Sequence, residues 1–307
     1  MKPVVLGIVG PTASGKSALA MLAALKLGGE VVCMDSMQVY RRMDIGTAKP
    51  TREEQRQIPH HMLDVAEPGD AYSVAEYAMG AGAAIRGILS RGKLPVLCGG
   101  TGLYLRALSR KMDFGGAPSD PKLRDAYQQF AQERGTLELH ALLEQKDPES
   151  AARLHPNDLR RVIRALEVQE ITGQPFSAQQ MPGDGDGPFD IRLFAIDWPR
   201  ETLYSRIEAR VGRMFCEGLV EEVRGLLYSG VMPEAQSMQG LGYKELVPCM
   251  QGEITIKDAA EKIIRRTRNY AKRQLTWFRA DGRIHWLPCE SGGDELLNLV
   301  REGLEGI

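Results

Sequence analysis

The sequence predicts an α/β fold in which a parallel sheet core is flanked by helices and carries an all-helical insertion. Near its start, an apolar run at residues 4–9 leads into a glycine-rich loop and then a helical stretch. Two further apolar runs, at 30–34 and 94–98, each end in a polar or glycine-rich loop. Between Leu123 and Gly173 the apolar residues recur only at helical spacing, so we expect a separate helical unit there.

The composition excludes several classes of protein. The 39 Lys and Arg residues balance the 40 Asp and Glu residues, so a site for a polyanion must be a local patch. The five cysteines are scattered without a C-x-x-C pair, which argues against a zinc ribbon or a disulfide framework and fits a reducing compartment. There is no signal-peptide pattern and no run of about 18 apolar residues, so we expect a cytoplasmic protein without a membrane partner.

The first loop has the pattern of a phosphate cradle, G-x-x-x-x-G-K-[ST]. Its residues are Gly10, Pro11, Thr12, Ala13, Ser14, Gly15, Lys16 and Ser17. In such a loop, backbone N–H groups and the positive end of the following helix surround an anion. We expect Lys16 to neutralise the outer phosphate and the Ser17 hydroxyl to bind Mg²⁺. The loop indicates a diphosphate or triphosphate without showing which one.

The second apolar run, residues 30–34, is typical of a buried strand and delivers Asp35 at its carboxyl end. Ligands of parallel sheets collect at the carboxyl ends of strands, so Asp35 should face the same cleft as the phosphate loop. Residues 36–50 have no clear periodicity and are predicted to line that cleft as a loop.

A pair of histidines, His60 and His61, precedes a helix that the capping box of Ser73 and Glu76 should start. Adjacent side chains diverge and no other ligands have suitable spacing, so we expect structural contacts rather than a metal site.

The third buried-type strand, residues 94–98, opens into Gly99-Gly100-Thr101-Gly102. This places the Thr101 hydroxyl at the sheet edge, where it either faces a ligand or caps the next helix.

The insertion is bounded by two Gly/Pro-rich stretches, one at residues 115–121 and one at 181–188. We therefore assign 1–117 and 190–307 to the catalytic core and 118–189 to the helical insertion.

The strand pattern resumes at residues 192–197 and is followed by an amphipathic helix that carries Arg206, Arg210 and Arg213. The arginines form either a solvated face or, through Arg206 or Arg210, the part of the anion site that lies opposite Lys16.

A glycine-punctuated turn at 239–245 precedes a basic stretch, residues 262–279, with seven Lys or Arg and no acidic residue. Such a helix fits either a solvated face or a track for a phosphate backbone, with aromatic residues available for stacking. A last strand at 284–287 and a helix at 294–302 complete the predicted core.

Taken together, the motifs resemble the bacterial tRNA dimethylallyltransferases, also called tRNA isopentenylpyrophosphate transferases, which have a P-loop NTPase-like core. The matching segments are GPTASGKS at 10–17, DSMQVY at 35–40, DIGTAKP at 44–50, GGTGLY at 99–104, HPND at 155–158, GLGYKE at 240–245 and AKRQLTWF at 271–278. The resemblance spans nearly the whole chain, and the combination of DSMQVY, DIGTAKP and GGTGLY is highly specific.

The resemblance implies transfer of a dimethylallyl group from its diphosphate to adenosine 37, beside the anticodon, of tRNAs that read codons starting with U. Asp35 would accept the proton of the flipped adenine's amine, while Lys16, Thr101, Mg²⁺ at Ser17 and an arginine of residues 206–213 would stabilise the leaving diphosphate. It also implies base contacts from Ser36, Met37 and Gln38. The residues expected to grip the tRNA anticodon stem-loop are Arg124, Arg160, Arg161, Arg164, Gly242, Lys244, Arg265, Arg268, Lys272 and Arg273. We expect a monomer.

Three other functions fit part of the sequence. A small-molecule kinase would use the same loop for ATP and Asp35 to activate a hydroxyl. A nucleotide-gated RNA-binding switch would need a guanine-selective or sensor motif, which we do not find. A prenyltransferase acting on free AMP or ATP shares the chemistry, but it would need neither the insertion nor the basic stretch.

Overall fold

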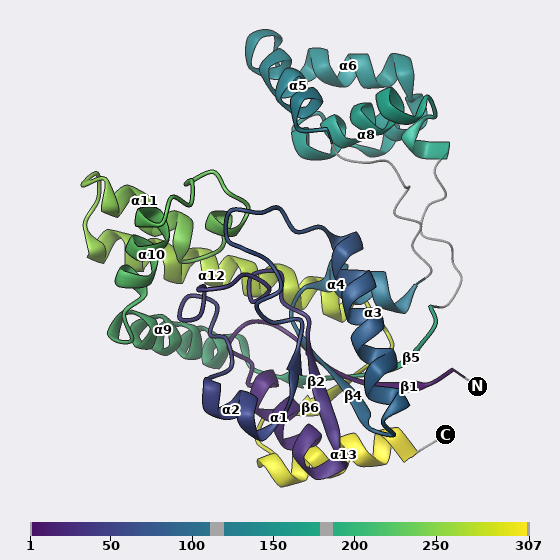
Figure 1. Ribbon diagram of the computed structural model, residues 1–307, viewed down its shortest axis with the longest axis vertical. Coiled ribbons are helices and arrows are strands. Elements are labelled where there is room, and N and C mark those ends of the chain that lie inside the picture. The colour runs from purple at the N-terminus through teal and green to yellow at the C-terminus, as the bar shows by residue number, and fades with distance from the viewer. Residues whose placement is uncertain (1, 111–119, 179–186, 306–307) are drawn as a thin grey trace. The chain divides into compact units, whose positions relative to one another are not determined.

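Six parallel strands form one sheet at the centre of the larger part of the molecule (Figure 1). The computed structural model describes residues 2–110, 120–178 and 187–305. The strands lie in the order β3-β2-β4-β1-β5-β6. Their bounds are β1 Val4–Val9, β2 Gly29–Cys33, β3 His60–His61, β4 Leu94–Gly99, β5 Asp190–Asp197 and β6 Ile284–Pro288. The predicted parallel α/β core is therefore confirmed.

The register of the strands brings the predicted functional loops together. Val9, the last residue of β1, pairs with Gly99 of β4, and Cys33 of β2 pairs with Cys98. Because all strands are parallel, the loops after β1, β2 and β4 leave the sheet at the same edge. This edge carries the phosphate loop, Asp35 and Thr101.

Alternating residues of β1 supply two hydrophobic cores, one on each face of the sheet. Leu6 and Ile8 pack with helices α1 (Lys16–Leu27) and α13 (Gly293–Glu305), whereas Val5 and Val9 pack with α3 (Val74–Ser90) and α4 (Gly102–Ser109). Figure 1 shows α1 and α13 on one face of the sheet. The near-continuous apolar runs of the strands follow from burial on both faces.

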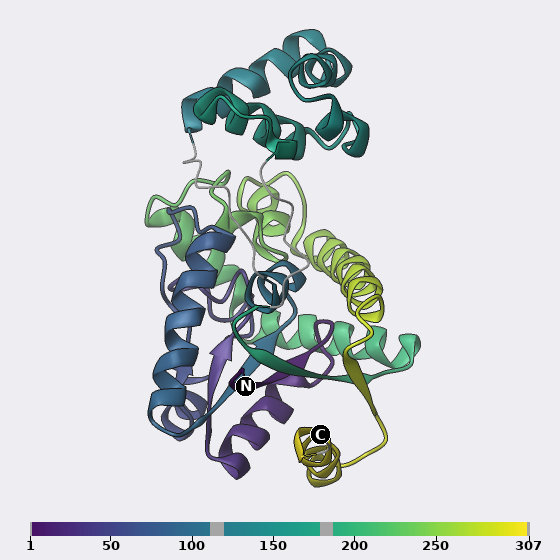
Figure 2. The ribbon, with the colours of Figure 1, turned by 90° about the vertical axis from the view of Figure 1, so that its right-hand side faces the viewer.

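A third hydrophobic core lies among the helices that follow β5. These are α9 (Arg200–Cys216), α10 (Leu219–Tyr228), α11 (Tyr243–Met250) and α12 (Ile256–Arg279), together with the 3-10 turn η2 (Ser237–Gln239). The short helix α2 (Arg52–Gln57) has no buried residue and lies outside this core. Figure 2 shows α9 and α12 running side by side. The loop after β2 enters this core through Val39, Tyr40 and Met43. The helices thereby cover the edge of the sheet where the loops emerge.

The chain divides into two compact units, residues 1–109 with 187–307 and residues 110–186. The smaller unit contains helices α5 (Pro121–Arg134), α6 (Thr136–Lys146), α7 (Pro148–Arg153) and α8 (Leu159–Thr172) and the 3-10 turn η1 (Phe176–Ala178) around a hydrophobic core of its own. The residues that the sequence predicts as the limits of the helical insertion lie mostly outside the described residues. These are Gly115, Gly116 and Pro118 and most of the stretch 181–188.

The N-terminal cap predicted for the helix after the histidine pair is confirmed. Ser73 caps α3 in a capping box with Glu76, as predicted, and Thr255 caps α12 with Asp258. The basic stretch is thus the later part of a longer helix. Among the described helices, none combines the length and apolar character needed to span a bilayer.

Candidate active site

The phosphate loop joins β1 to α1 and adopts a tightly curled backbone. Gly10, Ala13 and Gly15 have φ angles of 131°, 64° and 88°. The Lys16 Nζ donates to the carbonyl oxygen of Pro11 at 3.1 Å, so the ammonium lies across its own loop. The hydroxyl of Ser14 is buried and has no hydrogen-bond partner among the described residues. A buried polar atom of this kind is costly unless a ligand or water satisfies it, which favours a polar ligand in this loop.

Burial lowers the pKa of Lys16 below its ordinary value; the nearby Cys98 raises it, while Arg210 lowers it further. An anion bound in the loop would oppose both lowering effects, because it favours the charged ammonium. The electrostatics of the loop therefore suit an anionic ligand.

Asp35 lies two residues beyond β2 and organises the chain that follows it. Its Oδ1 accepts hydrogen bonds from the backbone N–H groups of Met37, at 2.9 Å, and Gln38, at 3.4 Å. Within the described part of the chain, Oδ2 has no hydrogen-bond donor. One carboxylate oxygen thus fixes the turn, and the other remains available to a ligand.

Thr101 connects the loops after β2 and β4. Its Oγ1 accepts a hydrogen bond from the Ser36 backbone N–H at 3.1 Å. The approach is close because residue 99 is glycine: a Cβ there would lie 2.0 Å from the carbonyl oxygen of Met34. Thr101 therefore lies at the sheet edge and contacts the Asp35 turn, a partner that the sequence did not predict.

Three adjoining hollows surround these residues. The phosphate hollow lies between the loop and α9 and is lined by Gly15, Lys16, Ser17, Arg206, Arg210 and Arg213. The central cavity contains Lys16 and Ser17 together with Asp35, Gln38 and Arg210. The outer groove contains Asp35, Ser36, Met37, Gly242, Lys244 and Arg273. Lys16 and Arg210 are thus shared by the first two hollows, and Asp35 and Arg210 by the last two.

Two arginines of α9 contact the loops at this edge. Arg206 donates through Nε to the carbonyl oxygen of Ala13 at 2.8 Å, and its guanidinium lies 4.4 Å from the ring centroid of Trp198. Arg210 donates to the carbonyl oxygen of Thr47 at 3.3 Å, and burial lowers its pKa while Asp35 raises it. Both guanidinium groups line the phosphate hollow, which leaves either able to hold an anion.

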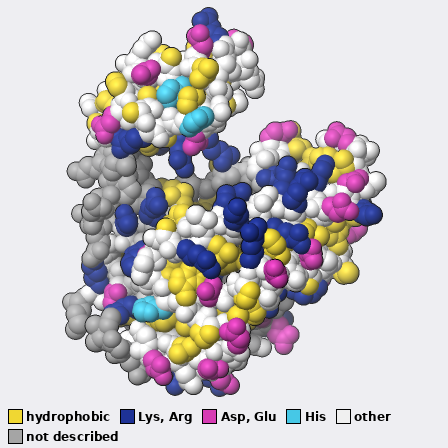
Figure 3. Space-filling view, turned by 180° about the vertical axis from the view of Figure 1, so that it is seen from behind, with side chains coloured by type: hydrophobic (Ala, Val, Ile, Leu, Met, Phe, Trp, Pro, Cys, Tyr) yellow, Lys and Arg dark blue, Asp and Glu magenta, His cyan; other side chains and the backbone are white. Residues whose placement is uncertain are grey.

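Helix α12 presents a partly exposed basic face. Figure 3 shows Lys and Arg side chains gathered on one face of the larger unit. Arg265, Lys272 and Arg273 are exposed. Arg266 pairs with Glu245 at 2.8 Å, and Arg268 pairs with Glu208. Arg265, Lys272 and Arg273 are therefore better placed than Arg266 and Arg268 to meet a phosphate backbone.

Two predicted tRNA contacts come from the turn before α11. The Gly242 N–H donates to Glu245 at 2.8 Å, and its φ of 96° is in the left-handed region. The Lys244 side chain is about one-third exposed and lines the outer groove.

The predicted tRNA-binding arginines of the smaller unit differ in their partners. Arg124 and Arg164 both hydrogen-bond to the fully buried carboxylate of Glu167. Arg160 and Arg161 are exposed at the start of α8, and Arg161 lies 3.3 Å from Asp158. Arg160 and Arg161 have no buried partner within the described residues, whereas Arg124, although about half exposed, and Arg164 pair with a buried carboxylate of the unit's core.

The histidine pair has structural contacts, as the sequence indicated. His61 contacts Glu30 at 2.7 Å, and His60 contacts the carbonyl oxygen of Ile58 at 2.7 Å. No group of three or more His, Cys, Asp or Glu side chains within the described ranges could hold a metal ion.

Sequence reasoning assigned no role to Gln274, which bridges two of the loops. Its Oε1 accepts from the Thr12 backbone N–H, and its Nε2 donates to the Gly100 carbonyl oxygen, both at 2.9 Å. Gln274 lies within the AKRQLTWF segment, so its place in a family motif was a signal. Its partners could not be found from spacing, because Thr12 is 262 residues away.

The sequence profile of a family described as "IPP transferase" matches residues 38–281, and a second, "Isopentenyl transferase", matches residues 3–66. A relative from Pelotomaculum thermopropionicum, named tRNA dimethylallyltransferase, is 50% identical over 95% of this chain and 93% of its own length.

Solved structures that resemble this chain belong to the same kind of enzyme. The tRNA delta(2)-isopentenylpyrophosphate transferase of Staphylococcus epidermidis is 40% identical, with a TM-score of 0.73 and complete coverage of both chains. A eukaryotic dimethylallyltransferase acting on tRNA is 28% identical, with a TM-score of 0.85 over 99% of this chain and 80% of the other. The likeness therefore extends over sequence and fold alike.

Proposed function

The chain belongs to the IPP transferase family of tRNA-modifying enzymes, and we propose that it transfers the dimethylallyl group of dimethylallyl diphosphate to the exocyclic amine of adenosine 37. The acceptors would be tRNAs that read codons starting with U. One observation carries the proposal: Lys16 and Asp35 line the same central cavity, which adjoins the phosphate hollow and the outer groove.

The phosphate hollow supplies the groups that the leaving diphosphate requires. As the bond between C1 of the dimethylallyl group and the diphosphate oxygen breaks, negative charge grows on that oxygen. Lys16, Arg206 and Arg210 line this space and would stabilise the charge. Their three cations match a polyanion better than a neutral ligand.

Asp35 is suited to act on the other substrate. The amine nitrogen of adenine forms a bond to C1 and loses a proton, which the free Oδ2 of Asp35 would accept. The Asp35 turn also presents Ser36 and Met37 toward the outer groove, where a base that has left the anticodon stack would enter.

A magnesium ion would be held at the Ser17 hydroxyl. The Ser17 hydroxyl is exposed in the first turn of α1, lines the phosphate hollow and is the hard oxygen ligand that Mg²⁺ prefers. When bound, the ion would neutralise diphosphate oxygens and so assist departure of the leaving group.

Exposed cations of both units would hold the tRNA. On α12 these are Arg265, Lys272 and Arg273, and on α8 they are Arg160 and Arg161. A free nucleotide would use few of these charges, so they favour a tRNA anticodon stem-loop as the acceptor.

We propose that the enzyme acts as a monomer in the cytoplasm.

The test is transfer of label from dimethylallyl diphosphate to an unmodified tRNA with adenosines at positions 36 to 38. AMP and ATP serve as parallel acceptors, with Mg²⁺ present or chelated. We expect label on adenosine 37 that disappears on chelation. Label on the mononucleotides instead would indicate a free-nucleotide transferase, and ATP-dependent phosphorylation without prenyl transfer would indicate a kinase.

A further inference from the structure

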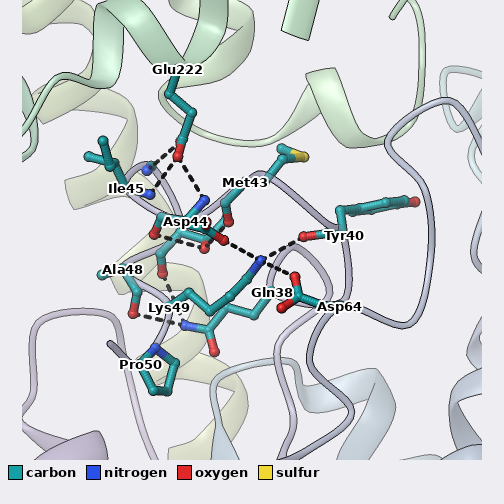
Figure 4. A network of polar contacts seen from close by, with 12 residues as sticks. Gln38, Tyr40, Met43, Asp44, Ile45, Ala48, Lys49, Pro50, Asp64 and Glu222 are labelled. Carbon is teal, nitrogen blue, oxygen red and sulfur yellow. Dashed lines mark hydrogen bonds and ion pairs between the residues drawn. The ribbon is translucent and has the colours of Figure 1, made fainter. Parts of the chain in front are cut away.

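The loop at residues 44–50 is held from two sides by charged side chains (Figure 4). On one side, the Lys49 ammonium uses its three N–H donors on the Tyr40 carbonyl oxygen at 2.7 Å, Asp44 at 2.6 Å and Asp64 at 2.7 Å. Its side chain is only 2% exposed. Lys49 therefore fixes the end of the loop to the chain that follows β2.

On the other side, the Glu222 carboxylate of α10 binds the start of the loop. Its Oε2 accepts from the N–H groups of Asp44 and Ile45, both at 2.8 Å, and its Oε1 accepts from the N–H of Gly46 at 3.0 Å. The Tyr243 hydroxyl donates to Oε1 at 2.6 Å. A carboxylate has about four acceptor sites, so these donors occupy all of them.

The loop held in this way determines how Gln38 presents its side chain. The Gln38 Nε2 donates to the carbonyl oxygens of Thr47, at 3.0 Å, and Ala48, at 3.1 Å. Both amide hydrogens are thereby used. The Oε1 accepts from the Cys33 thiol at 3.1 Å and retains one acceptor site. In the central cavity, Gln38 can therefore offer a ligand an acceptor and no donor.

We propose that Glu222, which lies outside the short sequence motifs named above, is a positioning residue that keeps Gln38 in this acceptor-only orientation. This inference rests on the proposed function. An adenine carries an amine donor at C6, which the Gln38 oxygen can accept, whereas hypoxanthine carries an acceptor there and would be repelled. The same loop accepts a hydrogen bond from Arg210 at Thr47, so displacement of the loop would also disturb the phosphate hollow.

The test compares Glu222→Gln with wild type. Glutamine keeps the size of the side chain, but its amide nitrogen cannot accept, so donors of the loop lose their partner. With an anticodon stem-loop RNA carrying adenosine 37, we expect kcat to fall about 100-fold and RNA affinity to change by less than about 3-fold, because small displacements of catalytic groups are that costly.

A second readout separates positioning from stability. An otherwise identical RNA with inosine at position 37 serves as a competitive inhibitor. We expect wild type to bind it about 10-fold more weakly than the adenosine RNA and the variant to lose this preference. A merely structural role would lower the melting temperature without changing the preference.

Two further variants complete the design. Gly46→Ala displaces the loop without changing Glu222, because its Cβ would lie 2.6 Å from the Tyr243 ring, and should reproduce both effects. Glu221→Gln is the matched control at the next position of α10. The Glu221 side chain is 68% exposed and, in the described structure, forms an ion pair only with Arg224, at 3.7 Å. Wild-type kcat, or an unchanged preference for adenosine, in Glu222→Gln would overturn the inference. Failure of the wild-type enzyme to prenylate the RNA would instead overturn the proposed function.

Discussion

Replacement of Asp35 by asparagine tests the proposed base without dismantling the turn that it holds. The Oδ1 of the carboxylate accepts from the Met37 and Gln38 N–H groups, and the amide oxygen of asparagine can do the same. What the substitution removes is the negative charge and the capacity of Oδ2 to take a proton. We therefore expect the fold to survive while proton transfer fails.

The expected fall in kcat follows from the proposed role of Asp35 as a general base. A positioned general base typically contributes about 10²- to 10⁴-fold, so kcat of Asp35→Asn should fall by that factor. Asp35→Ala also removes the acceptor of two backbone hydrogen bonds, each worth about 1 kcal/mol, and should lower stability by about 2 kcal/mol as well. Affinity for tRNA should change by no more than about 3-fold in either variant, since phosphate contacts dominate it.

The assay is single-turnover label transfer to tRNA, combined with filter binding and thermal melting. Asp125→Asn, at an exposed position of α5, controls for the substitution itself. Near-normal single-turnover transfer by Asp35→Asn would refute the assignment of Asp35 as general base. A large loss of tRNA binding would show that the carboxylate acts on affinity.

Three further variants test two other parts of the site and the stability of the fold. Arg206→Ala should raise the Kd for dimethylallyl diphosphate about 10- to 100-fold, the cost of one charge-assisted contact, and equilibrium dialysis giving an unchanged Kd would remove Arg206 from the diphosphate site. Joint replacement of Arg265, Lys272 and Arg273 by alanine should reduce the slope of log K against log salt by about 2 to 3, so a slope equal to that of wild type would show that these cations do not meet phosphates. Burial alone would raise the pKa of Glu30, but hydrogen bonds from its cationic neighbours lower it to about 2. The resulting stability, of order 3 kcal/mol, is present above pH of about 4.5 and is lost as pH falls toward 2, so Glu30→Gln should melt earlier than wild type at pH 7 but not at pH 2.

The sequence was most informative where local geometry requires a particular residue. The phosphate loop, the capping box at Ser73 and the alternation of apolar runs and helices each depend on neighbours within a few positions, so pattern alone predicted them. The family resemblance then added the activity class, which the relatives support.

Pairings between distant segments were beyond the reach of pattern. The basic face of α12 was predicted from charge, yet two of its arginines are engaged by Glu245 and Glu208. Likewise, Arg124 and Arg164 were assigned to tRNA, and the structure places both against Glu167. The sequence shows how many charged residues there are, whereas the tertiary structure determines which of them form ion pairs with each other.

By itself, then, the sequence determined the α/β core, the glycine-rich loop between β1 and α1, the place of Asp35 just beyond β2, and the family. Only the tertiary structure decided that Gln274 joins two loops and that Glu222 and Lys49 hold a third in place. The physical reason is the range of the interactions involved. Hydrogen bonds within a turn leave a signature in adjacent residues, but a carboxylate that binds amides 176 residues away leaves none until the chain has folded.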